Sequence, residues 1–258
     1  MQQSEASQLH KLVLAKEIVK ANELVQGSEF FQSIIETGTV PREMGRGFSC
    51  VTVLADLATV LRLATGDKKH VKLAAEAYQR VLPYLQSRFY LTRPWNSPRE
   101  PTADVVINAV NSHLFSLIVA GHPADALRAG HAFHTVMCSK LKASGDLVRV
   151  KETYLKSAFK ARVTMEENGI VLERRLSTWT KLQTEAAAYV ELVDTLTEDV
   201  WRRLEARLLH GLASLKCGNS REKEQVRQLL DKAKEGTYAD KLRVYIEAYE
   251  NLFMLFTR

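Results

Sequence analysis

A helix–turn–helix pattern in residues 106–127 constrains the fold more than any other feature of this chain. An amphipathic segment runs into Gly121, and a second helix is expected to begin at Pro123. Glycine readily adopts the positive φ that ends a helix, and a proline in the first helical turn loses no hydrogen bond. The small side chain of Ala126 allows the two helices to approach closely. The pattern therefore predicts an α-helical hairpin.

The same 3.6-residue periodicity of apolar residues recurs along almost the whole chain, and two-residue alternation is nearly absent. The first stripe contains Leu14, Ile18, Ala21 and Val25. Glycines separate the stripes at Gly27, Gly38, Gly66, Gly121, Gly169, Gly218 and Gly236. We predict an all-α fold without a sheet, made of about eleven helices in antiparallel hairpins. These hairpins are expected to stack as an α-solenoid or as an irregular right-handed array.

Short polar residues and one proline predict individual helix ends. Ser28, Asp67 and Thr197 are candidates for helix N-caps, because their side chains can accept a hydrogen bond from a backbone N–H. Asn219 with Glu222 resembles a capping box. Pro83 is expected to end or kink the helix that contains it.

Residues 88–101 interrupt the helical pattern, because three prolines fall within eight positions. We expect N-terminal hairpins in residues 1–87, a proline-rich loop in 88–101 and C-terminal hairpins in 102–258, with one continuous domain as the alternative. The loop carries Phe89, Tyr90 and Trp95. These aromatic residues are candidates for binding a partner, since aromatic side chains dominate interface energies. Packing back onto the hairpins is the alternative.

Two segments resemble known helical repeats. Residues 72–83 are similar to the second helix of a tetratricopeptide unit, with Ala74, Ala77 and Tyr78 in the matching places. Residues 106–127 resemble a pentatricopeptide unit, which is indicated by Asn111, Leu114, Leu117, Ala120-Gly121 and Ala126-Leu127. This resemblance implies a helical-hairpin architecture. Pentatricopeptide arrays read single-stranded RNA through two side chains of each unit, and those positions would be Ser112 and Lys142 here.

The basic charge balance leaves several partners open. The formal net charge is +6 and the sequence pI is about 9.2, which suits an RNA, an acidic protein or an anionic membrane surface. Two helical faces are candidates for contacting RNA phosphates, and their residues are Arg149, Lys151, Lys156 and Lys160 on one helix and Arg203 and Arg207 on another. Carboxylates such as Glu152 and Glu205 lie among them, so a solvated charged face is the alternative.

The chemistry-bearing residues do not match a catalytic or cofactor motif. His131, His134 and Cys138 share one helical face and could supply zinc ligands, but an amphipathic core edge accounts for them equally, and we expect no metal. We also expect no cofactor, no small-molecule substrate and no enzymatic activity. The three cysteines form no close pair, which is typical of a reducing compartment.

These observations predict an intracellular protein, in the cytosol or an organelle interior such as the mitochondrial matrix, without a membrane span. Its predicted function is that of a non-enzymatic helical-repeat scaffold or adaptor within a multi-subunit assembly. An RNA-associated helical-repeat protein of an organellar ribonucleoprotein complex is the alternative. The last predicted helix carries Leu242, Tyr245, Tyr249, Leu252, Phe253 and Phe256, and we expect this face to be buried inside the chain, so that the helix closes the stack.

Overall fold

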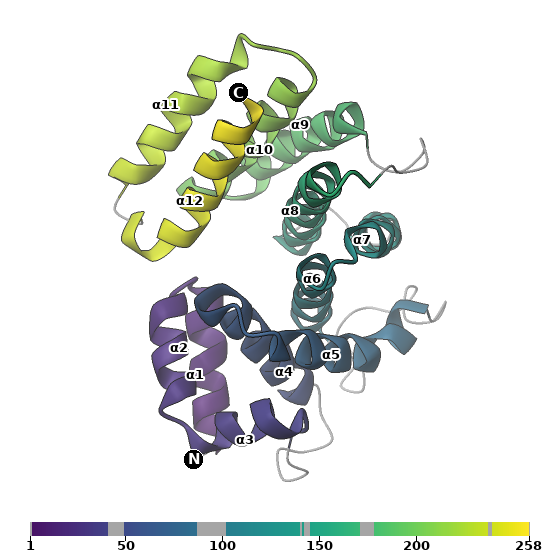
Figure 1. The fold of residues 1–258 in the computed structure, drawn as a ribbon, viewed down its shortest axis with the longest axis vertical. Coiled ribbons are helices and arrows are strands. Elements are labelled where there is room, and N and C mark those ends of the chain that lie inside the picture. Colours follow the sequence, from purple (N-terminus) through teal and green to yellow (C-terminus); the bar gives the residue numbers. More distant parts are fainter. Residues whose placement is uncertain are drawn as a thin grey trace. The chain divides into compact units, whose positions relative to one another are not determined.

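The computed structural model describes residues 2–40, 49–86, 102–139, 141, 145–170, 178–236 and 239–257. Within these ranges the chain forms twelve α-helices and one π-helical turn, and no strand is present (Figure 1). The prediction of an all-α fold is confirmed. Among the helices in these ranges, none is both long and apolar enough to cross a lipid bilayer.

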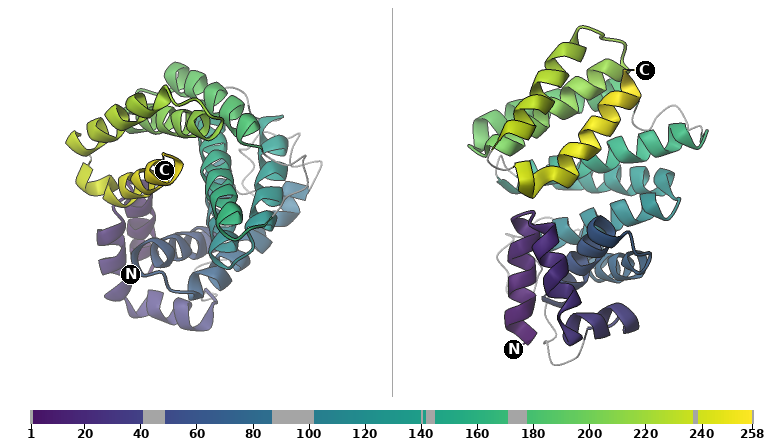
Figure 2. Two further views of the ribbon diagram at one scale, coloured as in Figure 1. Left: turned by 45° about the horizontal axis from the view of Figure 1, so that its top comes forward. Right: turned by 60° about the vertical axis from the view of Figure 1, so that its left-hand side comes forward.

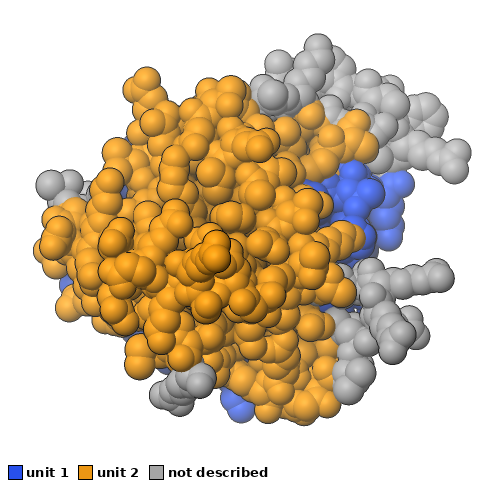
Figure 3. Space-filling view, turned by 90° about the horizontal axis from the view of Figure 1, so that it is seen from above, with its two compact units in different colours: residues 1–136 blue, residues 137–258 orange. Residues whose placement is uncertain are grey.

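The chain divides into two compact units, Met1–Val136 and Met137–Arg258, which Figure 3 distinguishes by colour. The division falls within α7. Residues 88–101, where the prolines suggested a boundary, lie outside the described ranges together with Phe89, Tyr90 and Trp95. The helices on either side of that segment, α5 and α6, pack against each other and belong to the same unit.

The first unit is built around α4. Its elements are α1 (Gln2–Leu14), α2 (Ile18–Gln26), α3 (Glu29–Thr37), α4 (Ser49–Val60), the π-helical turn η2 (Leu61–Thr65), α5 (Lys69–Gln86), α6 (Ala103–Val119) and α7 (Pro123–Cys138). Helix α4 packs against α1, α2, α5 and α6. It is apolar around most of its circumference, and Leu54, Leu57 and Ala58 are fully buried. Burial on several sides is what an almost continuously apolar helix requires.

The second unit is built around α10. Its helices are α8 (Gly145–Glu167), α9 (Trp179–Leu196), α10 (Val200–Lys216), α11 (Glu222–Glu235) and α12 (Ala239–Phe256). Helix α10 packs against the other four, and consecutive helices from α8 to α12 contact one another (Figure 2). Gly211 of α10 faces α11 so closely that a Cβ atom there would lie 2.5 Å from Val226 Cγ2. The missing side chain of this glycine therefore sets the distance between two helices.

Several predicted helix ends are confirmed. Gly121 has a φ of 87° between α6 and α7, and α7 begins at Pro123 as expected. The Ser28 hydroxyl accepts a hydrogen bond from Phe31 N at 3.4 Å and caps α3. The Asp67 carboxylate accepts one from Lys69 N at 2.8 Å at the start of α5. These ends depend on interactions between residues close in sequence, which is why the sequence predicts them.

Other predicted ends are wrong. Asp199, not Thr197, caps α10, because its Oδ1 accepts from Arg202 N at 3.1 Å, whereas Thr197 ends α9. Asn219 forms no capping box, since α11 begins at Glu222 itself after a tight turn. Helix α5 continues through Pro83 to Gln86, so Pro83 does not end it, and the alternative of a kink stays a prediction. The proline removes a single hydrogen bond in the last turn, and the helix tolerates that loss near its end.

The first apolar stripe does not form one helix. Leu14 ends α1 and is 51% exposed, Ile18 begins α2, and the chain turns between them at Lys16, whose φ is 59°. No glycine or proline marks this turn in the sequence. The residues before Leu14, which showed no clear stripe, form a helix of their own.

Ala126, which was expected to allow a close helix approach, and Ala74, which matches a tetratricopeptide position, are both fully buried. Ala74 lies on α5, which approaches α4 and α6 closely. Ala126 lies on α7, and α6 and α7 lack such an extended close approach. The other buried side chains of α7 include Leu127, Phe133 and Met137.

Candidate functional site

A buried carboxylate is the most unusual feature of the second unit. Glu205 lies on α10 in register with Trp201, Leu208 and Leu212, so it belongs to the face that the helix buries. Its exposed fraction is 0%. A carboxylate in this position is stable only if cations or hydrogen-bond donors compensate for its lost hydration.

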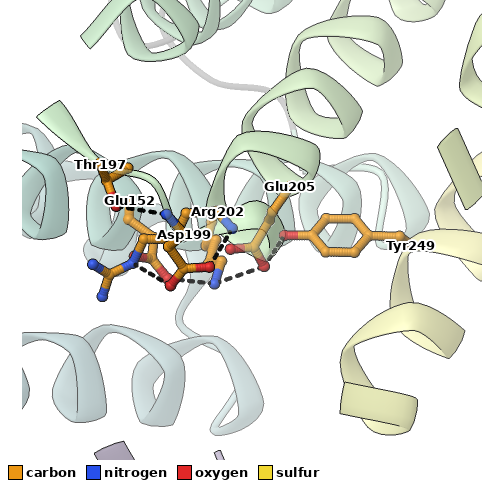
Figure 4. Close-up of polar contacts among 7 residues, drawn as sticks. Glu152, Thr197, Asp199, Arg202, Glu205 and Tyr249 are labelled. Carbon is orange, nitrogen blue, oxygen red and sulfur yellow. Dashed lines mark hydrogen bonds and ion pairs between the residues drawn. The ribbon is translucent and has the colours of Figure 1, made fainter. Parts of the chain in front are cut away.

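Two other helices supply this compensation. Lys156 of α8 places its Nζ atom 2.8 Å from Glu205 Oε1, and Tyr249 of α12 donates a hydrogen bond from its hydroxyl to the same oxygen at 2.9 Å (Figure 4). One oxygen atom of α10 thus receives contacts from α8 and α12. The contact joins three helices that are distant in sequence.

The contacts continue toward the surface through Glu152 and Arg202. Lys156 Nζ lies 2.7 Å from Glu152 Oε1, and Arg202 Nε lies 3.4 Å from Glu152 Oε2 (Figure 4). We call Glu152, Lys156, Arg202, Glu205 and Tyr249 the charge network. Two carboxylates and two cations balance within it, which is the condition for keeping several charges inside a protein.

The protonation states in the charge network do not favour catalysis. Burial alone would lower the pKa of Lys156, but Glu152 and Glu205 outweigh it and raise that pKa above the ordinary lysine value. Burial raises the pKa of Tyr249 well above 10, and the negative charge of Glu205 adds to this effect. The amine therefore stays protonated and the phenol stays neutral at neutral pH. Neither is poised as a nucleophile or a general base, and both instead fix the positions of α8, α10 and α12.

A second cluster holds the end of α12. Trp179 Nε1 of α9 donates to Glu166 Oε1 at 2.5 Å, and Lys216 Nζ of α10 lies 2.8 Å from Glu166 Oε2. The Lys216 amine also lies 4.8 Å from the ring centroid of Phe256, the last residue of α12. Burial opposes ionisation of Glu166, but its contacts with Lys216 and Trp179 lower its pKa overall. The predicted burial of the aromatic face of the last helix is confirmed for three of its six residues, Leu242, Tyr249 and Phe253, and the other three, Tyr245, Leu252 and Phe256, are half-buried.

The six residues that were candidates for RNA contact do not form one open stripe. Lys156 lies in the charge network, and Lys151 Nζ lies 3.4 Å from Glu185 Oε2. Arg207 Nη2 contacts both carboxylate oxygens of Asp194, at 3.0 and 2.8 Å.

The remaining three candidates differ in exposure. Arg203 Nε donates to the backbone oxygen of Thr197 at 2.7 Å. Arg149 is half-buried, and burial lowers its pKa. Lys160 is exposed. Phosphate binding by these residues stays a prediction, but most of the cations already contact an acceptor within the chain.

Ser112, one of the two positions implied by the pentatricopeptide resemblance, is fully buried. Its hydroxyl donates to the backbone oxygen of Ala55 at 3.3 Å, so it contributes to the packing of α6 on α4 and cannot contact a base from this position. Lys142, the other position, lies outside the described residues.

His131, His134 and Cys138 share α7 as expected, with His134 buried and the other two half-buried. Burial raises the pKa of the Cys138 thiol, and this disfavours the thiolate that binds zinc. Across the described ranges, no group of three or more His, Cys, Asp or Glu side chains is placed to hold a metal ion.

The sequence prediction missed Glu205 because it was interpreted only as a neighbour of Arg203 and Arg207. A signal was present: Trp201, Glu205, Leu208 and Leu212 follow a 4-3-4 spacing. A charged residue inside an apolar stripe indicates a buried partner. The identity of that partner could not be predicted, because Lys156 and Tyr249 come from other helices.

Comparison of the chain with protein-family models, with curated proteins and with solved structures finds no match. The resemblance to tetratricopeptide and pentatricopeptide units therefore stays a prediction, and the function has to be argued from the residues themselves.

Proposed function

We propose that this protein is a non-enzymatic helical scaffold that binds a partner protein, with its helices arranged as a stack of hairpins. The observation that carries the proposal is a second apolar stripe on α12. The buried stripe consists of Leu242, Ile246, Tyr249 and Phe253. The second stripe consists of Val244, Ala248 and Leu255, with Met254 beside it and the polar Asn251 between Ala248 and Leu255.

The two stripes lie on opposite sides of the helix. Each residue of the second stripe follows one of the first by two positions, which is a rotation of about 200°. Val244 is 41% exposed, Met254 is 54% exposed and Leu255 is 40% exposed. The outer side of α12 is mixed, because Arg243 and Glu247 are exposed as well. A helix that closes a stack normally has a polar outer face, which accounts for these two residues but not for the exposed apolar ones.

An amphipathic helix of a partner protein fits this stripe best. The 4-3-4 spacing of Val244, Ala248, Asn251 and Leu255 is the spacing that packs one helix along another. Asn251 at the centre supplies a polar position, and such positions fix the register of a partner helix. The charge network holds α12 from the opposite side, and the cluster of Glu166, Trp179 and Lys216 holds its end. The stripe is therefore presented on a helix whose position is fixed.

RNA association is the second candidate, and the net charge of +6 is the observation in its favour. The two proposals differ in their dependence on salt. Phosphate contacts lose affinity steeply as salt concentration rises, whereas burial of an apolar stripe does not.

The experiment is affinity purification of the tagged full chain from native extract, with and without ribonuclease and at low and high salt, followed by cross-linking and mass spectrometry. We expect a protein partner that survives ribonuclease and high salt, with cross-links to α12. The double variant Val244→Asp/Leu255→Asp should lose this partner, and the variant Glu247→Gln on the same helix should keep it. Loss of all partners on ribonuclease treatment would support RNA association instead, and equal capture by both variants would exclude α12 as the binding face.

A further inference from the structure

Asp56 is a second buried carboxylate, in the centre of the first unit. It is the single charged residue of α4 and is 2% exposed. Thr52 lies one turn before Asp56 and Thr59 lies one turn after it on the same helical face, and both are half-buried. This face is the polar side of an otherwise apolar helix. Polar composition is typical of contacts that form and separate, rather than of a permanent core.

Helix α1 covers this face and packs against both α4 and α2. His10 Nδ1 lies 2.9 Å from Asp56 Oδ2, and Leu9 is the single fully buried residue in the described part of α1. Burial raises the pKa of Asp56, and the contact with His10 counteracts this effect. The carboxylate therefore depends on a basic group that α1 brings to it.

The connection between α1 and α2 opposes this docked arrangement. Lys16 has a φ of 59°, and within the described ranges it is the one residue other than glycine with a positive φ. This conformation is unfavourable for a lysine, and two backbone hydrogen bonds that end α1 offset part of its cost, from Lys16 N to Val13 O and from Glu17 N to Leu12 O. The stripe of Leu14, Ile18, Ala21 and Val25 has the spacing of one continuous helix through the same position. An extended α1–α2 helix would relieve the unfavourable backbone conformation, at the cost of releasing α1 from α4 and of losing the packing of α1 on α2.

We propose that α4 has a helix-binding face, which α1 of the same chain occupies. Leu9 and the His10–Asp56 contact hold α1 on this face, and the backbone strain at Lys16 opposes this arrangement. The external ligand of this face is an amphipathic helix of a partner protein that carries a leucine followed by a basic residue. The basic residue meets Asp56 and the leucine replaces Leu9. This face belongs to the first unit and the α12 stripe belongs to the second, so each proposal can be tested independently of the other.

The first test compares Lys16→Gly with Lys16→Ala in the full chain. Both variants remove the lysine side chain, and they differ by one methyl group. Glycine favours the positive φ of the docked form, whereas alanine favours the continuous helix. We expect hydrogen exchange of the α1 amides to be faster in Lys16→Ala than in Lys16→Gly by roughly 30-fold, from the combined backbone preferences at the two conformations. Equal exchange rates, or the reverse order, would overturn the proposal.

The second test adds a fluorescent peptide of residues 2–16 to the same two variants and measures fluorescence anisotropy. We expect the peptide to bind Lys16→Ala more tightly than Lys16→Gly by up to roughly 30-fold, because its own α1 competes less. A peptide carrying His10→Glu should bind neither, since it would place a second carboxylate beside Asp56. Equal binding to the two variants, or equal binding of the two peptides, would show that α1 is an ordinary structural helix. The Val244→Asp/Leu255→Asp variant should give the same peptide affinity as its parent, so a failure here leaves the α12 proposal untouched.

Discussion

Removing the Lys156 amine should destabilise the second unit strongly. In a Lys156→Met variant, Glu205 would keep only the Tyr249 hydroxyl as a partner while remaining 0% exposed. Glu152 would still have Arg202, whose Nε lies 3.4 Å from Glu152 Oε2. The main cost therefore arises at Glu205, and breaking a buried ion pair costs about 3–5 kcal/mol.

A second substitution should reverse most of this loss of stability. The double variant Lys156→Met/Glu205→Gln removes the uncompensated charge and keeps an acceptor for the Tyr249 hydroxyl. Replacing both members of a buried pair by neutral groups is often close to neutral, so we expect the double variant to lose no more than about 2 kcal/mol. The two substitutions should therefore be non-additive, as expected for residues in direct contact.

The assay is urea and thermal unfolding, followed by far-ultraviolet circular dichroism. At about 2–4 °C per kcal/mol, the single variant should lower the melting temperature by roughly 6–20 °C. Lys160→Met is the control, because Lys160 is exposed on the same helix and should change stability by less than about 0.5 kcal/mol. If Lys156→Met behaves like this control, or if the double variant is no more stable than the single one, the charge network does not support the fold as argued.

Three further predictions concern packing and pH. Stability should decrease as the pH rises above about 10, because Lys156 and Tyr249 both have raised pKa values in the folded state. The stabilisation from a raised pKa is complete below the unfolded pKa and is lost as the pH rises from that value through the folded one. Tyr249→Phe should weaken this decrease in alkaline unfolding curves. Gly211→Ala should destabilise by about 1–3 kcal/mol, because the new Cβ would lie 2.5 Å from Val226 Cγ2, and a stabilised variant would contradict the close approach of α10 and α11. Ala74→Leu should also cost about 1–3 kcal/mol by overpacking a fully buried position, with the exposed Ala248→Leu as the control that keeps its melting temperature.

The secondary structure was largely predictable from the sequence, because it depends on residues that are neighbours along the chain. The apolar stripes predicted the helices, Gly121 and Pro123 predicted the turn between α6 and α7, and Ser28 predicted a cap. A predicted helix end was wrong where a second residue close by can cap the helix equally well. Asp199 lies two residues from Thr197 and is an equally good cap, so the sequence offered two starts for α10 and the fold uses one.

The sequence by itself also contained the signal that Glu205 needs a partner, because Glu205 lies inside the apolar stripe of Trp201, Leu208 and Leu212. Asp56 carries a similar signal as the one charged residue of an otherwise apolar segment. Only the tertiary structure decided which partners they have. Tyr249 is 44 residues from Glu205, and His10 is 46 residues from Asp56. The turn at Lys16 was decided in the same way, because the stripe itself favours a continuous helix and the contacts of α1 with α4 and α2 oppose it. Periodicity specifies which side of a helix is buried, but the groups that meet there depend on how separate helices pack.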